Sequence, residues 1–377
     1  MGTTITTPAH EIGGSLASAT PAPLAAGATL GRVETLSTEF VSGWASVQIS
    51  GRFAHVYAML EDEVIGFGAA SMTRPDLEKA RLEKRLEAHA FTLAFKRRVG
   101  AELVPSIQVF VVGQPSMLPR ARQLKIDRTP VLRMFLMGSP RSGTSQLGTT
   151  LTKVLGLPWL GEGHGAPLFA SAADALTGDR AAENGLVRHL ARENFRQIAV
   201  QAARSAYFYM HGSASFVDKT PGVKMIAAAP FLVECFPDSF FIFLRRNPVA
   251  NIRSRLVKFG GDFEGHCRDW AAAMNEWLRV RTLLPHYVEI QQEDMLETPE
   301  RVARVLADYI GVPESAERIC ESLKTEHLEQ TGAGAGKPDR LQAGWTAEQV
   351  RAFERICGPA MGAFGYRLGE DRGRGAK

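Results

Sequence analysis

The stretch FLMGSPRSGTSQL, residues 135–147, decides the fold of the larger part of this chain. It reads as an apolar strand that enters a turn between Gly138 and Gly143 and continues from Thr144 as a helix. Such a turn gathers main-chain N–H groups at the positive end of the helix dipole, which favours a bound anion. The glycine spacing matches the phosphate-binding pattern G-x-x-x-x-G-K-[ST], but the lysine of that pattern is missing. The cation inside the loop is Arg141 instead.

The region around this stretch alternates strand-like and helical patterns. The strand-like runs are VLRMFLMG, SFVDKT, SFFIFLRR and YVEIQQED, and the clearest helical patterns cover residues 186–210 and 265–284. This alternation predicts an α/β domain over residues 131–377, with a P-loop-type parallel sheet flanked by helices. In such sheets ligands bind beyond the carboxyl ends of the strands.

The N-terminal part of the chain follows a different pattern. Short apolar runs such as FVSGWASVQI and SIQVFVVG, separated by turns, predict a small β-rich, sandwich-like domain over residues 31–115. Residues 1–30 are rich in Thr, Ala, Pro and Gly and predict a flexible tail, and residues 116–130 predict a linker. The segments VSGWA, RPDLEKA and AFTLAF loosely resemble an accessory module found beside carbohydrate-modifying transferases.

Composition narrows the function classes. The net charge of +4 is too small to predict a nucleic-acid partner. The four cysteines lie far apart, which disfavours a disulfide framework or a cysteine metal site. No signal-peptide pattern and no run of eighteen apolar residues is present, so we expect a cytoplasmic protein without a transmembrane segment.

A second cationic position follows the strand-like run SFFIFLRRNP, which ends in Arg245 and Arg246. A kinase or nucleotide hydrolase needs a magnesium-binding carboxylate at such a strand end. Arginine instead offers a fixed fork that matches phosphate or sulfate oxygens. We therefore predict an anion held by protein groups without a metal. Arg253, Arg255 and Lys258 fit a solvated basic helix face equally well.

These two motifs resemble those of PAPS-dependent sulfotransferases, whose donor is 3′-phosphoadenosine 5′-phosphosulfate (PAPS). GSPRSGTS resembles the 5′-phosphosulfate loop of that family, and RRNPVANIRS resembles its 3′-phosphate motif, in which a serine follows an arginine by eight residues. The resemblance runs from about residue 131 to the C-terminus and is greatest to the tyrosylprotein-type and related bacterial members, whose loop cation is arginine. It implies PAPS as co-substrate. The donor-binding residues that we predict are Gly138, Pro140, Arg141, Ser142, Gly143, Thr144, Ser145, Arg246, Ser254, Lys258 and Lys337.

The chemistry requires a base and a group that stabilises the leaving oxygen. Glu162 is the predicted general base, because its distance in sequence from Arg141 matches the tyrosylprotein-type branch, and His164 is the second candidate. Lys219 in FVDKTP matches the family's catalytic lysine, and we assign it with Arg141 to the leaving group. Asp218 either orients Lys219 or forms a structural ion pair.

The sequence therefore predicts in-line sulfuryl transfer from PAPS to a hydroxyl or amine, with a carboxylate base. The acceptor is a small molecule or a glycan, and the β-rich domain associates it with carbohydrate or another glycoconjugate. A P-loop kinase or NTPase, and a non-catalytic binding protein that kept the fold, remain as alternatives. Neither the acceptor nor the oligomeric state can be read from these residues.

Overall fold

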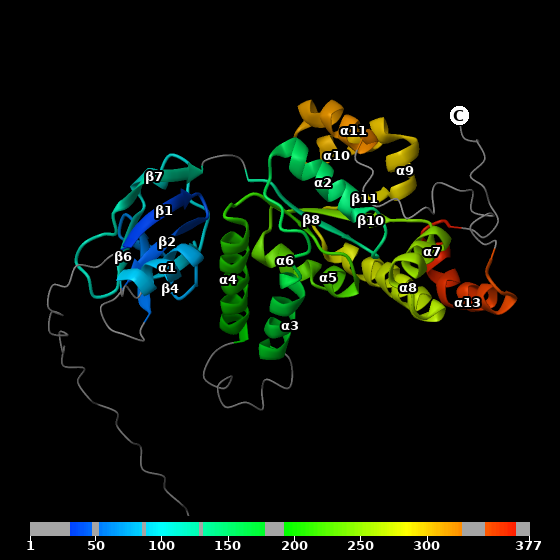
Figure 1. Cartoon of the computed structure of the whole chain (residues 1–377), viewed down its shortest axis with the longest axis horizontal. Coiled ribbons are helices and arrows are strands. Elements are labelled where there is room, and N and C mark those ends of the chain that lie inside the picture. The colour runs from blue at the N-terminus through cyan, green and yellow to red at the C-terminus, as the bar shows by residue number, and fades with distance from the viewer. Residues whose placement is uncertain are drawn as a thin grey trace, which may run out of the picture.

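Two packed β-sheets form the N-terminal part of the computed structural model, and a parallel sheet between two helical layers forms the rest (Figure 1). The structure describes residues 31–46, 53–84, 88–127, 131–177, 192–325 and 344–366. Lys337 and the tail of residues 1–30 lie outside these ranges. Within them, no helix is both long and apolar enough to cross a membrane.

The N-terminal domain is a sandwich of a four-stranded sheet in the order β5-β2-β1-β7 and a three-stranded sheet in the order β4-β3-β6. Inward side chains of both sheets, among them Val33, Val41, Val56 and Ile65, form one buried apolar cluster. This confirms the predicted β-rich architecture. The elements are β1 Gly31–Ser37, β2 Phe40–Ser46, β3 Ala54–Leu60, β4 Glu63–Ala70, α1 Pro75–Lys84, β5 Ala88–Ala94, η1 Val104–Ser106, β6 Gln108–Val111 and β7 Arg120–Asp127.

The segment expected to be a linker, residues 116–130, contains strand β7. This strand pairs in parallel with β1, with Leu36 opposite Ile126. Its sequence RARQLKID carries four charges in eight residues, as edge strands often do, and none of its side chains is fully buried. The apolar alternation that marks other strands is therefore weak here, and the sandwich extends to Asp127.

The second domain is built on a parallel sheet in the order β11-β10-β8-β9. Its strands are β8 Arg133–Gly138, β9 Phe216–Lys219, β10 Phe240–Arg245 and β11 Val288–Gln291. The helices are α2 Thr144–Leu155, α3 Gly165–Thr177, α4 Arg192–His211, α5 Val223–Ala227, α6 Ala229–Cys235, α7 Pro248–Phe259, α8 Phe263–Val280, α9 Gln292–Glu297, α10 Pro299–Tyr309, α11 Ala316–Thr325 and α13 Ala347–Ala363, with 3-10 turns η3 Arg281–Leu283 and η4 Pro313–Ser315.

The parallel sheet is buried on both faces. Along β8, Phe135 and Met137 join the apolar cluster on one face, whereas Met134 and Leu136 join the cluster on the other. Helices α2, α10 and α11 cover one face, and α5, α6 and α8 cover the other (Figure 1). This double burial explains why the strands read as continuous apolar runs, and it confirms the predicted α/β class.

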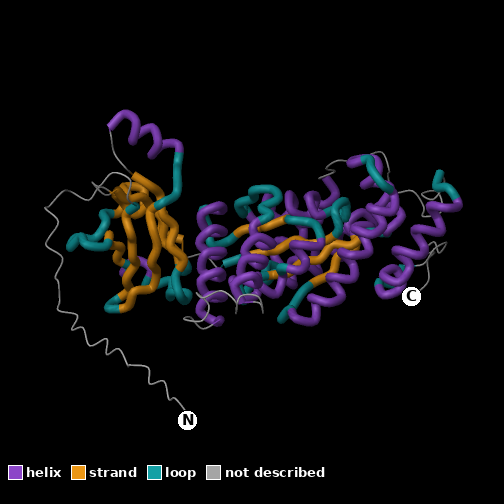
Figure 2. Tube along the Cα trace, turned by 90° about the horizontal axis from the view of Figure 1, so that it is seen from below, coloured by secondary structure: helices purple, strands orange, loops and turns teal. Residues whose placement is uncertain are grey.

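The two domains share a buried contact beside α4, which stands between them in both views (Figures 1 and 2). Glu39, in the turn between β1 and β2, forms ion pairs with Arg133 and Arg204. Next to it, Phe40 stacks on Phe208 of α4 with ring centroids 4.9 Å apart. The sandwich is thus packed into the core of the second domain.

Candidate functional site

The loop after β8 has the backbone that its glycines require. Gly138 lies so close to β10 that an added Cβ would sit 2.3 Å from the carbonyl oxygen of Leu244. Gly143 has a φ of 88° and is the N-cap of α2, which has no side-chain cap. Between them Arg141 also adopts a left-handed conformation, with a φ of 72°. The first N–H groups of α2 therefore face the loop without a capping side chain.

A buried asparagine holds the loop in place. The Asn251 side-chain amide on α7 donates to the carbonyl of Pro140 at 3.0 Å and to the hydroxyl of Ser142 at 3.1 Å. The Ser142 amide donates in turn to the carbonyl of Ser139. The hydroxyl and the backbone N–H of Ser142 are thus engaged within the loop framework, and its side chain is fully buried.

The predicted cations of the two motifs meet in the structure. Arg246 Nη1 donates to the carbonyl of Arg141 at 3.1 Å, and Arg141 Nε donates to the hydroxyl of buried Ser254 at 3.1 Å. Burial lowers the pKa of Arg246, while the nearby Glu293 acts in the opposite direction. Arg246 Nε is buried and has no hydrogen-bond partner in the described part of the chain. This cluster, Arg141, Arg246 and Ser254, is called the arginine cluster below.

Other predicted donor-binding residues lie around it. Thr144 is buried at the start of α2 and Ser145 is exposed, while Lys258 is exposed in the last turn of α7. Lys337 falls in residues 326–343, outside the described ranges.

The three predicted catalytic side chains Glu162, His164 and Lys219 also come together. Lys219 Nζ donates to Glu162 Oε1 at 2.7 Å, and His164 Nε2 lies 3.2 Å from Glu162 Oε2. The Lys219 side chain is only 6% exposed, whereas those of Glu162 and His164 are 41% and 63% exposed. A carboxylate open to solvent is thus held between an ammonium group and an imidazole.

Behind this group lies a buried polar network. Asp218 accepts hydrogen bonds from Tyr207 Oη at 2.6 Å and from Thr220 Oγ1 at 2.7 Å. Thr220 Oγ1 also accepts from the backbone N–H of His164. Burial raises the pKa of Asp218, and the two hydroxyl donors oppose that shift. Asp218 therefore supports the loop that carries Glu162 and His164, and its hydrogen bonds do not go to Lys219.

Three further residues were not predicted. Tyr207 reads as a core aromatic in a helical pattern, and Asn251 lies unmarked inside the second motif. Arg255 looked like part of a solvated face, yet it is buried, pairs with Asp269 at 2.5 Å and donates to Ser139 Oγ at 3.3 Å. Only the position of Asn251 within the motif and of Arg255 directly after it could have marked them, because their partners are distant in sequence.

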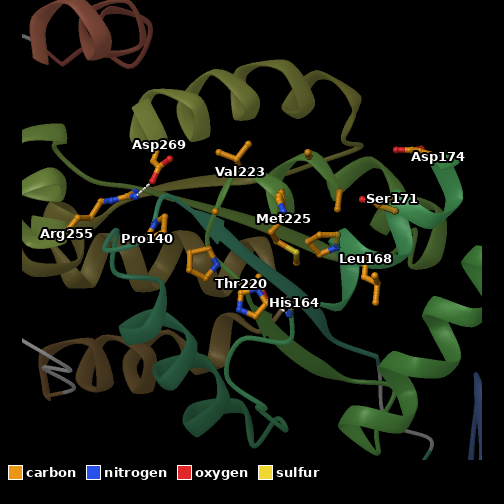
Figure 3. A pocket seen from close by; sticks show the side chains of 17 residues that line it. Pro140, His164, Leu168, Ser171, Asp174, Thr220, Val223, Met225, Arg255 and Asp269 are labelled. Carbon is orange, nitrogen blue, oxygen red and sulfur yellow. Dashed lines mark hydrogen bonds and ion pairs between the residues drawn. The ribbon is translucent and has the colours of Figure 1, made fainter. Parts of the chain in front are cut away.

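A cavity of about 820 Å³ opens beside the loop. Pro140 and His164 line it on the side of the catalytic group, and α3 and α5 form its walls (Figure 3). The lining of the cavity includes Pro140 and His164 but none of the three members of the arginine cluster.

Comparison with known proteins identifies this arrangement. Residues 133–316, which carry the loop, both clusters and the sheet, match the profile of the sulfotransferase family. This part of the chain belongs to the sulfotransferase family. No curated protein sequence matches the chain.

Solved structures also resemble this sulfotransferase-family domain. The sulfotransferase domain from the Synechococcus PCC 7002 olefin synthase is 19% identical and has a TM-score of 0.39, with 64% of this chain and 96% of that chain covered. A sulfotransferase from Mycobacterium avium is 15% identical with a TM-score of 0.40, over 64% of this chain and 79% of that chain. A sugar kinase from Janibacter sp. is 19% identical with a TM-score of 0.28, over 49% of this chain and 98% of that chain.

Proposed function

We propose that this protein transfers a sulfuryl group from PAPS to an acceptor hydroxyl or, with the same groups, an amine. The observation that carries the proposal is the position of the two clusters. Arg141 and Arg246 follow β8 and β10, and Lys219, which binds Glu162, is the last residue of β9, so both clusters lie at the carboxyl edge of one parallel sheet. Donor binding and proton transfer thus have separate groups at one edge.

The arginine cluster suits the anionic groups of PAPS. Two guanidinium groups meet there, and Arg246 has a buried Nε without a protein acceptor in the described residues. Such an orphaned donor is costly unless a ligand satisfies it. The uncapped start of α2 adds main-chain N–H groups beside Arg141. We assign Arg246 and Ser254 to the 3′-phosphate and the loop to the 5′-phosphosulfate, with Lys258 and Lys337 as further cations toward the nucleotide.

The second group performs the proton transfer. PAPS, when bound, supplies the sulfuryl group. Glu162 accepts the proton of the acceptor hydroxyl as its oxygen forms the new O–S bond. The S–O bond to the donor phosphate breaks, and its electron pair stays on that phosphate oxygen. Lys219 and Arg141 stabilise this developing charge, while the Asp218 network holds the Glu162 loop in place.

The donor assignment is tested by comparing adenosine 3′,5′-bisphosphate with adenosine 5′-monophosphate and ATP–magnesium in calorimetric titrations of the full chain. We expect the bisphosphate to bind most tightly. Removing a charge-assisted contact in Arg246→Ala should weaken bisphosphate binding by about 10- to 100-fold, with little effect on the monophosphate. Arg253→Ala, which removes the same charge from the following helix α7, is the matched control. Tighter binding of ATP–magnesium would overturn the proposal in favour of a kinase or NTPase.

The base is tested with Glu162→Gln. This variant should bind adenosine 3′,5′-bisphosphate as the wild type does but lose at least about 100-fold in turnover, the usual contribution of a general base. Full activity in Glu162→Gln together with loss of activity in His164→Ala would transfer the role to His164.

A further inference from the structure

We propose that the acceptor is an alcohol on an aliphatic body, bound in the cavity between α3 and α5, rather than a free saccharide. This inference rests on the proposed function. It deepens that function by naming the substrate class, and it replaces the carbohydrate acceptor expected from the accessory domain.

The cavity lies on the acceptor side of the loop. Pro140 lines it, whereas the neighbouring Arg141 takes a left-handed backbone and contacts Ser254 on α7. The members of the arginine cluster are outside the lining of the cavity, and His164 is within it. A molecule in the cavity therefore places its reactive end at the Glu162–His164 pair and leaves the cationic side to the donor.

Apolar side chains line much of the cavity between its ends, with Lys224 of α5 also in the lining. Its walls include Leu168 of α3 and Val223 and Met225 of α5, which face the same space (Figure 3). Leu168 is 69% exposed, so an apolar surface is presented here without a protein partner covering it. A polar ion pair, Arg255 with Asp269, lies at one end, and Ser171 and Asp174 lie at the other (Figure 3). Contact with an apolar ligand would remove this surface from water.

The lining does not suit a free sugar. A saccharide presents hydroxyl groups on every side, and each must find a partner when it is buried. Among the described residues that line the cavity there is no Trp, Tyr or Phe to stack on a sugar ring and no Asn or Gln, and its charged side chains are Asp174, Lys224 and the paired Arg255 and Asp269. The Thr220 hydroxyl is already engaged with Asp218. A volume of about 820 Å³ is within the range of pockets that hold a small organic ligand.

The test measures release of adenosine 3′,5′-bisphosphate from PAPS by the full-length protein with straight-chain primary alcohols from ethanol to decanol. All of these acceptors share one reacting group. Burial of each added methylene should raise kcat/KM about fourfold until the cavity is filled. Saturation-transfer NMR of octanol with adenosine 3′,5′-bisphosphate present measures binding without turnover.

Leu168→Ala removes apolar surface at an exposed position, so the protein should remain folded. We expect it to lower kcat/KM for octanol about tenfold or more and to reduce the preference for octanol over ethanol. Leu283→Ala, at another exposed leucine (56% exposed) outside the cavity lining, is the control and should change neither.

The failures of the two proposals differ. If adenosine 3′,5′-bisphosphate does not bind, the sulfotransferase function itself fails. If it binds but kcat/KM is the same for all chain lengths, or if maltoheptaose is sulfated and octanol is not, the function stands and the aliphatic acceptor is wrong.

Discussion

Glu39→Gln tests the contact between the two domains with an isosteric change that removes only charge. The Glu39 side chain is 5% exposed and lies against Arg133, which is 1% exposed. Its second oxygen lies 3.4 Å from Arg204 Nη2. Burial lowers the pKa of Arg204, and the charge of Glu39 is the main opposing influence. The substitution therefore leaves two buried guanidinium groups without their shared carboxylate.

The expected loss of stability follows from the partners that remain. Breaking a buried ion pair from one side costs about 3–5 kcal/mol. Arg133 keeps the half-exposed Asp238 and the carbonyl of Ala214, and Arg204 keeps the carbonyl of Phe95. These contacts place the loss near the lower end, at about 3 kcal/mol. For a chain of 377 residues, that corresponds to a decrease in Tm of roughly 4 °C.

Differential scanning calorimetry and urea unfolding measure this change. Glu63→Gln is the matched control, because Glu63 pairs with Arg97 on the same domain but is 49% exposed. It should cost less than about 1 kcal/mol. Adding Arg204→Met to Glu39→Gln should recover part of the loss, since one uncompensated charge is removed. If Glu39→Gln destabilises no more than Glu63→Gln, the electrostatic reasoning is refuted.

Three other predictions concern single positions. Gly138→Ala places a Cβ 2.3 Å from a carbonyl oxygen of β10 and should lower the free energy of unfolding by more than about 2 kcal/mol. The control Gly358→Ala, in open space on α13, should not lower it. Equal urea midpoints for the two variants would contradict this prediction. Burial lowers the pKa of His211 from 6.5 to about 4, so the unfolded state binds more protons between these values and stability falls as pH drops through that range. His211→Phe should therefore remove up to about 2 kcal/mol of this loss of stability at pH 5. If the difference in Tm between pH 7 and pH 5 is the same in His211→Phe as in the wild type, His211 is not its source. Tyr207→Phe removes a hydroxyl donor from buried Asp218 and should lower the free energy of unfolding by about 1–3 kcal/mol. It should also slow turnover without weakening the binding of adenosine 3′,5′-bisphosphate. Unchanged turnover would show that Tyr207 has no positioning role.

The sequence predicted the parallel sheet well because each strand is buried on both faces. A mostly apolar run such as residues 133–138 is stable only where both faces of the strand are covered. Strand β7 was missed because its charged, half-exposed side chains lack that signal. The domain contact was missed for another reason. Glu39 and Arg204 are far apart in the chain, and nothing local distinguishes a carboxylate destined for burial from one on the surface.

In the candidate site, too, local sequence predicts some features and distant contacts decide others. Gly138, Arg141 and Arg246 belong to local motifs at the ends of predicted strands, and this placement, with the resemblance to sulfotransferases, predicted that they lie at one edge of the sheet. Ser142 belongs to the same motif, yet its hydroxyl accepts from Asn251 on a distant helix. Motif membership thus predicts which residues lie at the sheet edge, whereas tertiary packing decides which of them face a ligand and which hold the loop.

Helix α4 joins the domain contact to the catalytic loop. Arg204 and Tyr207 are three residues apart and therefore lie on neighbouring positions of one helix face. Arg204 contacts Glu39 of the sandwich, and Tyr207 contacts Asp218 behind the Glu162 loop. Because a packed helix moves as a unit, displacing the sandwich should displace the donor to Asp218. If the Glu39 contact only held the two domains together, Glu39→Gln would lower Tm and leave turnover unchanged. We expect that variant also to lower turnover at saturating donor, since the position of α4 sets the position of the base.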